Sequence, residues 1–221
     1  MRVTVNGISV FYEVSGNGPA LILIHGNSED HTTFDDAVPY LEDRFTVYRP
    51  DTRGHGQSSP PPDGEYHYAD MAADLQGFIT SLGIERPVVC GYSDGGIVAL
   101  LHAMDNPNAV SRVIACGANT DPSNLTGFWA FRLRLTRGHG DPKLRMMLHE
   151  PRISAEDLSR ITCPVLSVAG SRDCIKQSDT VFIAESVRDG RVLIIPDADH
   201  SSYVEDGPTL ARIILDGNRG P

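Results

Sequence analysis

The chain has 221 residues, of which 40% are hydrophobic and 22% charged, a balance typical of a globular protein with one sizeable core. Acidic residues outnumber lysine and arginine by 29 to 19, and the resulting charge of −10 disfavours nucleic acid and anionic lipid as partners, because such a surface repels phosphate groups. The N-terminus lacks signal-peptide features, and no apolar run approaches the ~20 residues of a membrane span, so no membrane association is expected.

The first 15 residues alternate apolar and polar side chains around Asn6-Gly7, which predicts a β-hairpin. Short apolar runs then recur, and each predicts a strand buried on both faces of a parallel sheet. They are Ala20–Ile24, Phe45–Tyr48, Pro87–Cys90, Val110–Cys116, Pro164–Val168 and Arg191–Ile195. Segments with helical spacing lie between and after them, at Tyr68–Leu82, Gly95–Met104, Ser178–Val187 and Tyr203–Leu215. This alternation predicts an α/β fold whose mostly parallel central sheet has helices on both faces.

One segment breaks the alternation of strands and helices. Between residues 117 and 160 no strand is recognised, and the only tryptophan, Trp129, lies in the aromatic cluster Phe128–Phe131. We interpret this segment as a small, mainly helical cap inserted into a single domain of residues 1–221. The aromatic cluster is expected to pack in the cap, with a pocket lining or a dimer contact as alternatives.

The four cysteines predict neither a disulfide framework nor a metal site. Cys90, Cys116, Cys163 and Cys174 are scattered without Cys-x-x-Cys spacing, and the first three lie in or beside apolar runs, where a thiol acts as a small hydrophobe. The sequence also lacks a phosphate-binding loop, so we expect no cofactor and no metal. A reduced, cytoplasmic protein is the simplest expectation.

The segment Gly91-Tyr92-Ser93-Asp94-Gly95 matches Gly-x-Ser-x-Gly and lies between a predicted strand and a predicted helix. A nucleophile that projects above a sheet needs such a tight turn, and the flanking glycines allow neighbouring backbone to come close. The following helix directs its N-terminal N–H groups at the site, where negative charge develops during reaction. Ser93 is therefore the candidate nucleophile.

A serine hydroxyl needs a base within hydrogen-bonding distance, and His200 follows the last predicted strand. The acid that orients this base is expected to be Asp173, in the turn after the strand Pro164–Val168, and Asp121 is the alternative. The order Ser93, Asp173, His200 is the order expected for α/β-hydrolases. Asp173 would fix the tautomer of His200 and stabilise its protonated form.

The oxyanion produced by such a nucleophile requires two N–H donors. The first is expected to be the backbone N–H of Asp94, the residue after the nucleophile. The second is expected from Asn27, in the loop His25-Gly26-Asn27 that follows the strand Ala20–Ile24. His25 would hold this loop through its ring instead of acting as a base.

Together these segments resemble the α/β-hydrolase superfamily in order and over nearly the whole chain. The motifs are Leu23-Ile24-His25-Gly26-Asn27, Asp51-x-Arg53-Gly54-His55-Gly56-x-Ser58, Gly91-Tyr92-Ser93-Asp94-Gly95-Gly96, Gly170-Ser171-Arg172-Asp173 and Asp199-His200. The resemblance implies that the segment around His55 is a support for the oxyanion loop. The elbow is also similar to those of esterases and aminoacyl-ester hydrolases of the valacyclovirase-like branch. Dehalogenases and epoxide hydrolases of this fold are excluded, because they carry Asp at the nucleophile position.

The expected function is hydrolysis of small carboxylic esters through an acyl-enzyme on Ser93. A reduced cap leaves the substrate open, and carbon–carbon bond, thioester, lactone and aminoacyl-ester or amide hydrolysis remain alternatives with the same triad. The carboxylate of Asp94 is expected to cap its helix, with recognition of a cationic substrate group as the alternative. The rival of another class is a non-catalytic small-molecule receptor on the same scaffold.

Overall fold

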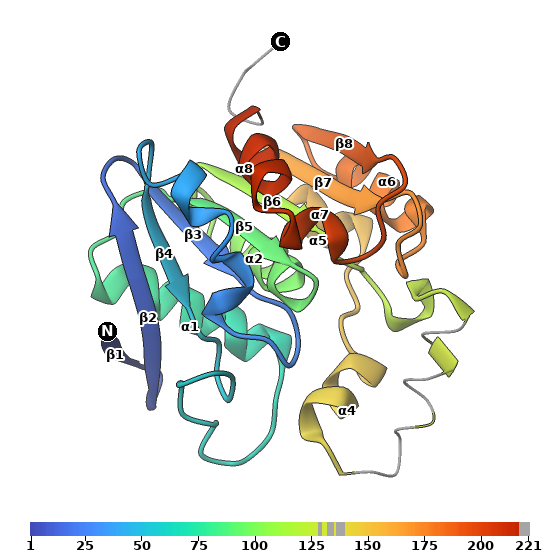
Figure 1. Cartoon of the computed structure of the whole chain (residues 1–221). Helices are drawn as coiled ribbons and strands as arrows, with labels where there is room; N and C mark the ends of the chain where they lie inside the picture. Colours follow the sequence, from blue (N-terminus) through green and yellow to red (C-terminus); the bar gives the residue numbers. More distant parts are fainter. Residues whose placement is uncertain (128–129, 132–134, 136–139, 217–221) are drawn as a thin grey trace.

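The computed structural model describes residues 1–127, 130–131, 135 and 140–216 (Figure 1). Its centre is an eight-stranded sheet with the order β1-β2-β4-β3-β5-β6-β7-β8. The strands are β1 (Arg2–Val5), β2 (Ile8–Gly16), β3 (Ala20–Ile24), β4 (Thr46–Pro50), β5 (Val88–Tyr92), β6 (Arg112–Cys116), β7 (Val165–Gly170) and β8 (Gly190–Ile195). Strand β2 pairs antiparallel with β1 and β4, and all other pairings are parallel. The predicted mostly parallel sheet is therefore confirmed.

The hairpin between β1 and β2 forms where the sequence predicts it. Asn6 and Gly7 have φ angles of 45° and 79°, as a two-residue turn between twisted antiparallel strands requires. Asparagine and glycine are the residues that adopt such angles at low cost. This turn fixes the register in which Val5 lies opposite Ile8.

Helical segments cover both faces of the sheet (Figure 1). They are the 3₁₀ helices η1 (His31–Phe34), η2 (Val38–Tyr40) and η3 (Pro122–Asn124), and the α-helices α1 (Tyr68–Ser81), α2 (Asp94–Asp105), α4 (Pro142–His149), α5 (Ala155–Ser159), α6 (Gln177–Ser186), α7 (Ser202–Glu205) and α8 (Gly207–Asp216). Helices α1, α2, α5 and α6 pack on one face, whereas η1, η2, α7 and α8 pack on the other.

Strand β3 shows why the apolar runs are continuous. Ile22 and Ile24 belong to the core on the side of α1 and α2, whereas Leu21 and Leu23 belong to the core on the opposite side. All four side chains are at most 1% exposed. Burying each one contributes about 1.5–3 kcal/mol, so both faces of the central strands stabilise the fold.

The predicted helix at Tyr203–Leu215 is in fact two helices, α7 and α8, separated at Asp206. Pro208 lacks the N–H that a continuous helix would use and its ring would clash with the preceding turn. At Gly207 a Cβ atom would lie 1.9 Å from the carbonyl oxygen of Asp36, so the chain turns against η2 at this glycine. The periodicity of apolar residues did not reveal this break because both helices bury the same side.

Between β6 and β7 the described chain forms η3, α4 and α5 and adds no strand to the sheet. Figure 1 shows α4 standing apart from the sheet, beyond the ends of the parallel strands. Phe128 and Trp129 lie outside the described residues. Among the described residues, Phe131 and Leu135 are each 60% exposed.

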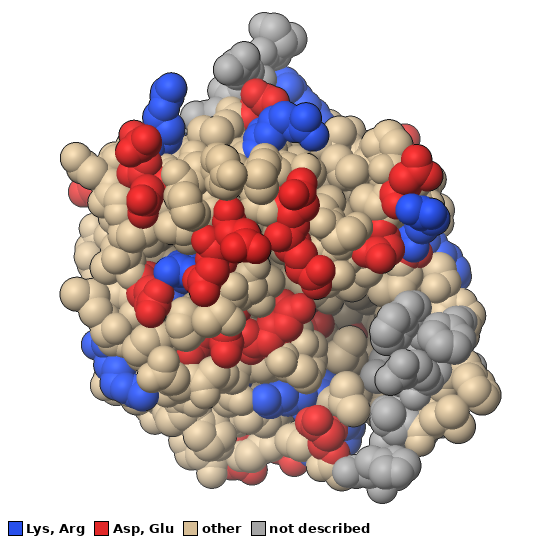
Figure 2. Space-filling view, in the orientation of Figure 1, with Lys and Arg blue, Asp and Glu red and all other residues tan. Residues whose placement is uncertain are grey.

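Acidic groups gather across the middle of the face shown in Figure 2, where they prevail over basic groups. This agrees with the net charge of −10. Every helix in the described parts of the chain is too short or too polar to cross a bilayer. The four cysteines are all buried and unpaired.

Candidate active site

The site is built on the turn from β5 into α2, where Ser93 has a φ of 52° and a ψ of −117°. A non-glycine residue with positive φ is strained, and surrounding packing must hold it in place. A Cβ atom at Gly91 would lie 2.0 Å from the carbonyl oxygen of Gly95, and one at Gly95 would lie 2.1 Å from that of Ile24. Glycine is therefore required at both positions, and the close approach of α2 to β3 raises Ser93 above the sheet.

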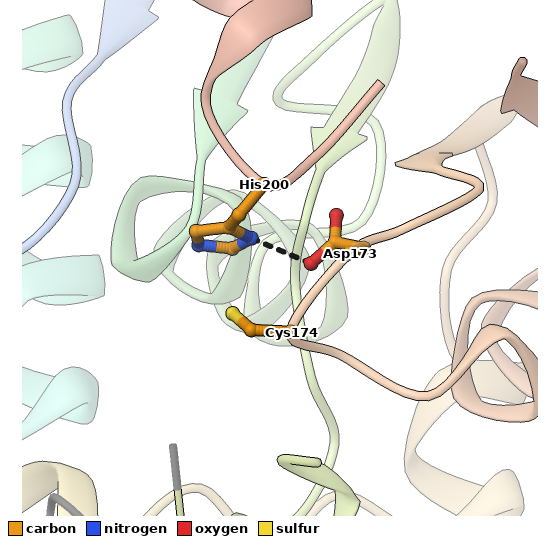
Figure 3. Close-up of side chains that lie close together, drawn as sticks. All are labelled: Asp173, Cys174 and His200. Atoms are coloured by element: carbon orange, nitrogen blue, oxygen red, sulfur yellow. Dashed lines mark hydrogen bonds and ion pairs between the residues drawn. The ribbon is translucent and has the colours of Figure 1, made fainter. Parts of the chain in front are cut away.

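The ring of His200 lies between Ser93 and Asp173. Its Nε2 atom is 3.1 Å from Ser93 Oγ, and its Nδ1 atom is 2.7 Å from Asp173 Oδ1. Figure 3 shows the imidazole and the carboxylate facing each other from the loops that follow β8 and β7. The structure thus brings together the three residues that the sequence proposed as a triad, although they are far apart in the chain.

Asp173 is held in place independently of His200. Its side chain is completely buried, and its Oδ1 atom also accepts a hydrogen bond of 2.9 Å from the backbone N–H of Ile175. Burial lowers the pKa of His200, but hydrogen bonds to Asp173 and Cys174 outweigh it and raise that pKa to about 10. Asp173 therefore favours the protonated imidazole, which is the form that a base must reach after accepting a proton.

Two backbone N–H groups, those of Asn27 and Asp94, belong to segments that lie next to Ser93. The loop at Gly26 approaches so closely that a Cβ atom there would lie 3.2 Å from Ser93 Cβ. Within the described chain, neither the Asn27 N–H nor the Asp94 N–H has a hydrogen-bond acceptor. A helix N-terminus and an adjacent loop with free N–H groups can stabilise an anion that forms at this position.

The Asp94 carboxylate links the two loops that carry these N–H groups. Its Oδ2 atom accepts a hydrogen bond of 2.9 Å from Asn27 Nδ2, and its Oδ1 atom accepts one of 2.7 Å from the Tyr68 hydroxyl. Asp94 is 5% exposed and Tyr68 is 2% exposed. Burial raises the pKa of Asp94, and the two hydrogen bonds oppose that rise. The side chain therefore braces the loops and does not cap α2.

Sequence reasoning missed Tyr68 and Glu29. Tyr68 is the first residue of α1, and the sequence indicated only that it lies in an amphipathic helix. Glu29 Oε2 accepts hydrogen bonds from the Gly26 N–H at 3.0 Å and from Thr33 Oγ1 at 3.2 Å, so it stiffens the loop before Asn27. Burial raises the pKa of Glu29. A glutamate three residues after a glycine has no distinctive sequence signal, so only the fold reveals its role.

His25 lies where the sequence expected it, with its ring holding the loop. Its Nδ1 atom is 2.7 Å from the Gly26 carbonyl oxygen, and its Nε2 atom accepts a hydrogen bond of 3.0 Å from the Thr52 N–H. Burial lowers the pKa of His25, so the neutral ring is favoured. His55 lies beside it and contacts the Arg53 carbonyl oxygen at 3.0 Å. These two rings connect the His25–Asn27 loop to the Asp51–Ser58 turn.

Asp121, the alternative acid, is engaged elsewhere. Its carboxylate accepts a hydrogen bond of 2.8 Å from the Ser123 N–H at the start of η3 and lies 3.4 Å from Arg152 Nη1. The geometry therefore favours Asp173 as the partner of His200.

Helix α4 is attached to the loop that leads from β4 into α1. Lys143 Nζ donates a hydrogen bond of 2.6 Å to the Gly54 carbonyl oxygen, and Glu150 accepts one of 3.1 Å from the Tyr68 N–H. Because Tyr68 also contacts Asp94, the helical segment after β6 is tied to the support of the site.

Two groups of described side chains could hold a metal ion. One consists of Asp30, His31 and Asp51, and the other consists of Asp173, Cys174 and His200. In the first group Asp51 accepts hydrogen bonds from the backbone and ring of His31 and from the backbone N–H of Gln57, so it joins η1 to the Asp51–Ser58 turn.

Comparison with known proteins identifies the family. Residues 19–136 match the family model described as alpha/beta hydrolase fold, which is more than half of the chain. The chain therefore belongs to the α/β-hydrolase family.

Individual relatives extend this result. The human serine hydrolase BPHL is 28% identical over 247 aligned residues, covering 97% of this chain and 84% of the human protein. An uncharacterized protein of Mycobacterium tuberculosis is 39% identical over 115 residues, but the match spans only 52% of this chain and 33% of that protein. A thermophilic esterase from Thermogutta terrifontis, solved with malate bound, has a TM-score of 0.80 at 25% identity, with 98% of this chain and 97% of the esterase covered.

Proposed function

We propose that the chain is a serine hydrolase that cleaves small carboxylic esters through an acyl-enzyme on Ser93. The observation that carries this proposal is the continuous hydrogen-bonded series Ser93–His200–Asp173, next to two N–H groups that have no acceptor among the described residues. A nucleophile, an oriented base and anion donors are the three requirements of acyl transfer. No other group is needed for the reaction.

In the first half-reaction, Ser93 Oγ attacks the ester carbonyl carbon while His200 Nε2 accepts the hydroxyl proton. The carbonyl oxygen becomes an oxyanion between the N–H groups of Asn27 and Asp94. The intermediate then collapses, the bond to the alcohol breaks, and His200 returns its proton to the departing oxygen. Water follows the same route in the second half-reaction and releases the carboxylic acid and free Ser93.

The ester preference rests on the demands of the chemistry and on the relatives. Simple esters have a better leaving group than amides, and His200 protonates it, so they need little help from the segment between β6 and β7. We also propose that this segment, residues 117–160, is a reduced cap on a single domain. The similarity to a structure described as an esterase and to a human serine hydrolase supports this class of reaction. Carbon–carbon bond, thioester, lactone and amide substrates use the same groups and form the comparison set for the assay.

Aminoacyl esters are the second candidate because a carboxylate, Asp94, lies next to Ser93. Here both of its oxygens accept hydrogen bonds, from Tyr68 and Asn27, and the residue is buried. These contacts favour bracing of the oxyanion loop over binding of an α-amino group. Comparing alanyl and propionyl esters on the wild type and on Asp94→Asn separates the two roles, since only recognition of an amino group produces a preference that the substitution removes.

The test is intact-mass labelling with a fluorophosphonate together with hydrolysis of acetyl, butyryl and octanoyl nitrophenyl esters. We expect one adduct on Ser93 and turnover that falls as the acyl chain lengthens. Ser93→Ala should lose the adduct and reduce turnover by about 10³-fold or more. Ser201→Ala is the matched control, because it removes a hydroxyl next to His200 that makes no capping hydrogen bond.

Each outcome discriminates between the proposals. A labelled Ser93 without ester turnover directs the search to the other bond types. Tight binding with product release too slow for turnover would identify a receptor instead of an enzyme. Near-normal turnover in Ser93→Ala would refute the proposed nucleophile.

We further propose a reducing compartment such as the cytoplasm, which the four unpaired thiols support.

A further inference from the structure

Cys174 lies against the acid and base of the proposed triad and helps raise the pKa of His200, but its thiol takes part in no step of the proposed reaction. It follows Asp173 directly and is 9% exposed, and its thiol is free. One ligand atom each from Asp173, Cys174 and His200 lies within 4.8 Å of the other two. Figure 3 shows the sulfur below the imidazole and the carboxylate beside it. Three different metal-binding side chains therefore converge on one point.

This set of donors suits a particular class of ion. A thiolate sulfur, an imidazole nitrogen and a carboxylate oxygen are the ligands of zinc, at distances of about 2.0–2.3 Å. Tetrahedral ligands at those distances lie roughly 3.2–3.8 Å apart. In the structure His200 Nδ1 and Asp173 Oδ1 are 2.7 Å apart, and one ligand atom of each of the three residues lies within 4.8 Å of the others, so the observed separations bracket the tetrahedral ones.

The site is also accessible from one side. The side chain of His200 is 23% exposed, whereas that of Asp173 is completely buried. Of the three side chains, His200 is therefore the one that solvent reaches most readily. The net negative charge of the chain raises the concentration of cations near its surface.

We propose that Asp173, Cys174 and His200 form a binding site for a divalent transition-metal ion of the zinc class, and that its occupation reversibly stops hydrolysis. The ion replaces the proton between His200 Nδ1 and Asp173. The imidazole proton then resides on Nε2, and the Cys174 thiol releases its proton to solvent as the thiolate binds the metal. A protonated Nε2 donates to Ser93 Oγ and cannot accept its proton, so the nucleophile is not activated. The inhibitory consequence rests on the proposed hydrolase function, whereas binding of the ion does not.

Binding is tested directly with Co²⁺ on the purified wild-type protein. A bound thiolate produces a sulfur-to-cobalt charge-transfer band in the near ultraviolet, and we expect it to saturate at one ion per chain. Zn²⁺ should displace the cobalt and remove the band. Cys174→Ala should lose the band, and Cys163→Ala, which removes a different buried thiol, should retain it. Absence of the band in the wild type, or an equal band in Cys174→Ala, would overturn the site.

Inhibition is tested separately by ester turnover with Zn²⁺ and then with excess chelator. We expect Zn²⁺ to stop turnover and the chelator to restore it. The Zn²⁺ concentration for half-inhibition should rise at least about 10- to 100-fold in Cys174→Ala, because removing even a supporting partner of a ligand has that effect. Equal sensitivity in both proteins would refute the inhibitory role.

The two experiments fail in distinguishable ways. Ser93→Ala should keep the cobalt band, because Ser93 is not one of the ligands. A band without any ester turnover in the wild type would retain the metal site and refute the ester hydrolase. Turnover with a labelled Ser93 but no cobalt band would retain the hydrolase and refute the metal site.

Discussion

The hydroxyl of Tyr68 offers a sharp test of how the site is supported. It donates a hydrogen bond of 2.7 Å to Asp94 Oδ1 in a fully enclosed position. In Tyr68→Phe the ring remains and only this donor is lost. Asp94 then keeps a single described side-chain donor, Asn27 Nδ2, at 2.9 Å. Because burial already raises the pKa of Asp94, losing a donor should raise it further.

The expected loss of stability in Tyr68→Phe follows from the type of hydrogen bond that is removed. A hydrogen bond to a charged group contributes about 1.5–3 kcal/mol, so we expect the free energy of unfolding of Tyr68→Phe to fall by about 2 kcal/mol. For a chain of this size that corresponds to a decrease in Tm of about 4–8 °C in thermal unfolding. The brace between α2 and the Asn27 loop also loosens. We therefore expect kcat for ester hydrolysis to fall by roughly tenfold, less than the loss of a whole oxyanion donor, with KM little changed.

Tyr203→Phe is the matched control. Tyr203 is as deeply buried as Tyr68, but its hydroxyl lies 3.5 Å from the Val168 carbonyl oxygen and contributes little. An equal decrease in Tm in Tyr68→Phe and Tyr203→Phe would refute the stabilising role of the Tyr68–Asp94 hydrogen bond. A lower Tm in Tyr68→Phe with unchanged kcat would retain the stabilising hydrogen bond and remove the positioning role.

Two further predictions follow from the site. The neutral form of His200 is the base and its pKa is raised, so kcat/KM should fall as the pH decreases through a value above 6.5. Asp173→Asn should shift this acidic fall in the pH profile to lower pH and reduce kcat by about 10⁴-fold. A wild-type profile that falls only at or below pH 6.5 would contradict the raised pKa. Gly95→Ala should lower the free energy of unfolding in urea by about 3 kcal/mol or more because its Cβ would lie 2.1 Å from a backbone oxygen. Gly127→Ala, with nothing within 4 Å, should be close to neutral, and equal effects of the two substitutions would contradict the close approach.

The strands and the main helices could be predicted because their cause is local. A strand buried on both faces must be apolar at every position, and a helix that packs on a sheet repeats its apolar side chains every three or four residues. Ala20–Ile24 is predicted and observed with the same boundaries. The single helix predicted for Tyr203–Leu215 was wrong because periodicity alone does not register the break at Gly207-Pro208, and the turn there also packs against the backbone of Asp36, far away in the chain.

The triad residues could be proposed because each follows a predicted strand. Parallel strands end at the same edge of the sheet, so Ser93, Asp173 and His200 were expected to be neighbours. The choice between Asp173 and Asp121 was only a preference at that point. Tertiary structure favours Asp173, since Asp121 is occupied with η3 and Arg152 while Asp173 lies 2.7 Å from the ring.

What the amino-acid sequence determined by itself was the α/β architecture, the elbow at Ser93 and the chain order of the candidate acid and base. Those features depend on periodicity and on turn chemistry, which neighbouring residues encode. Only the tertiary structure decided that Tyr68 and Glu29 brace the segments around Asn27 and that the Cys174 sulfur lies beside His200. Tyr68 and His200 reach their partners from segments distant in the chain, and the local contacts of Glu29 depend on how its loop is folded, so no pattern of neighbouring residues records these arrangements.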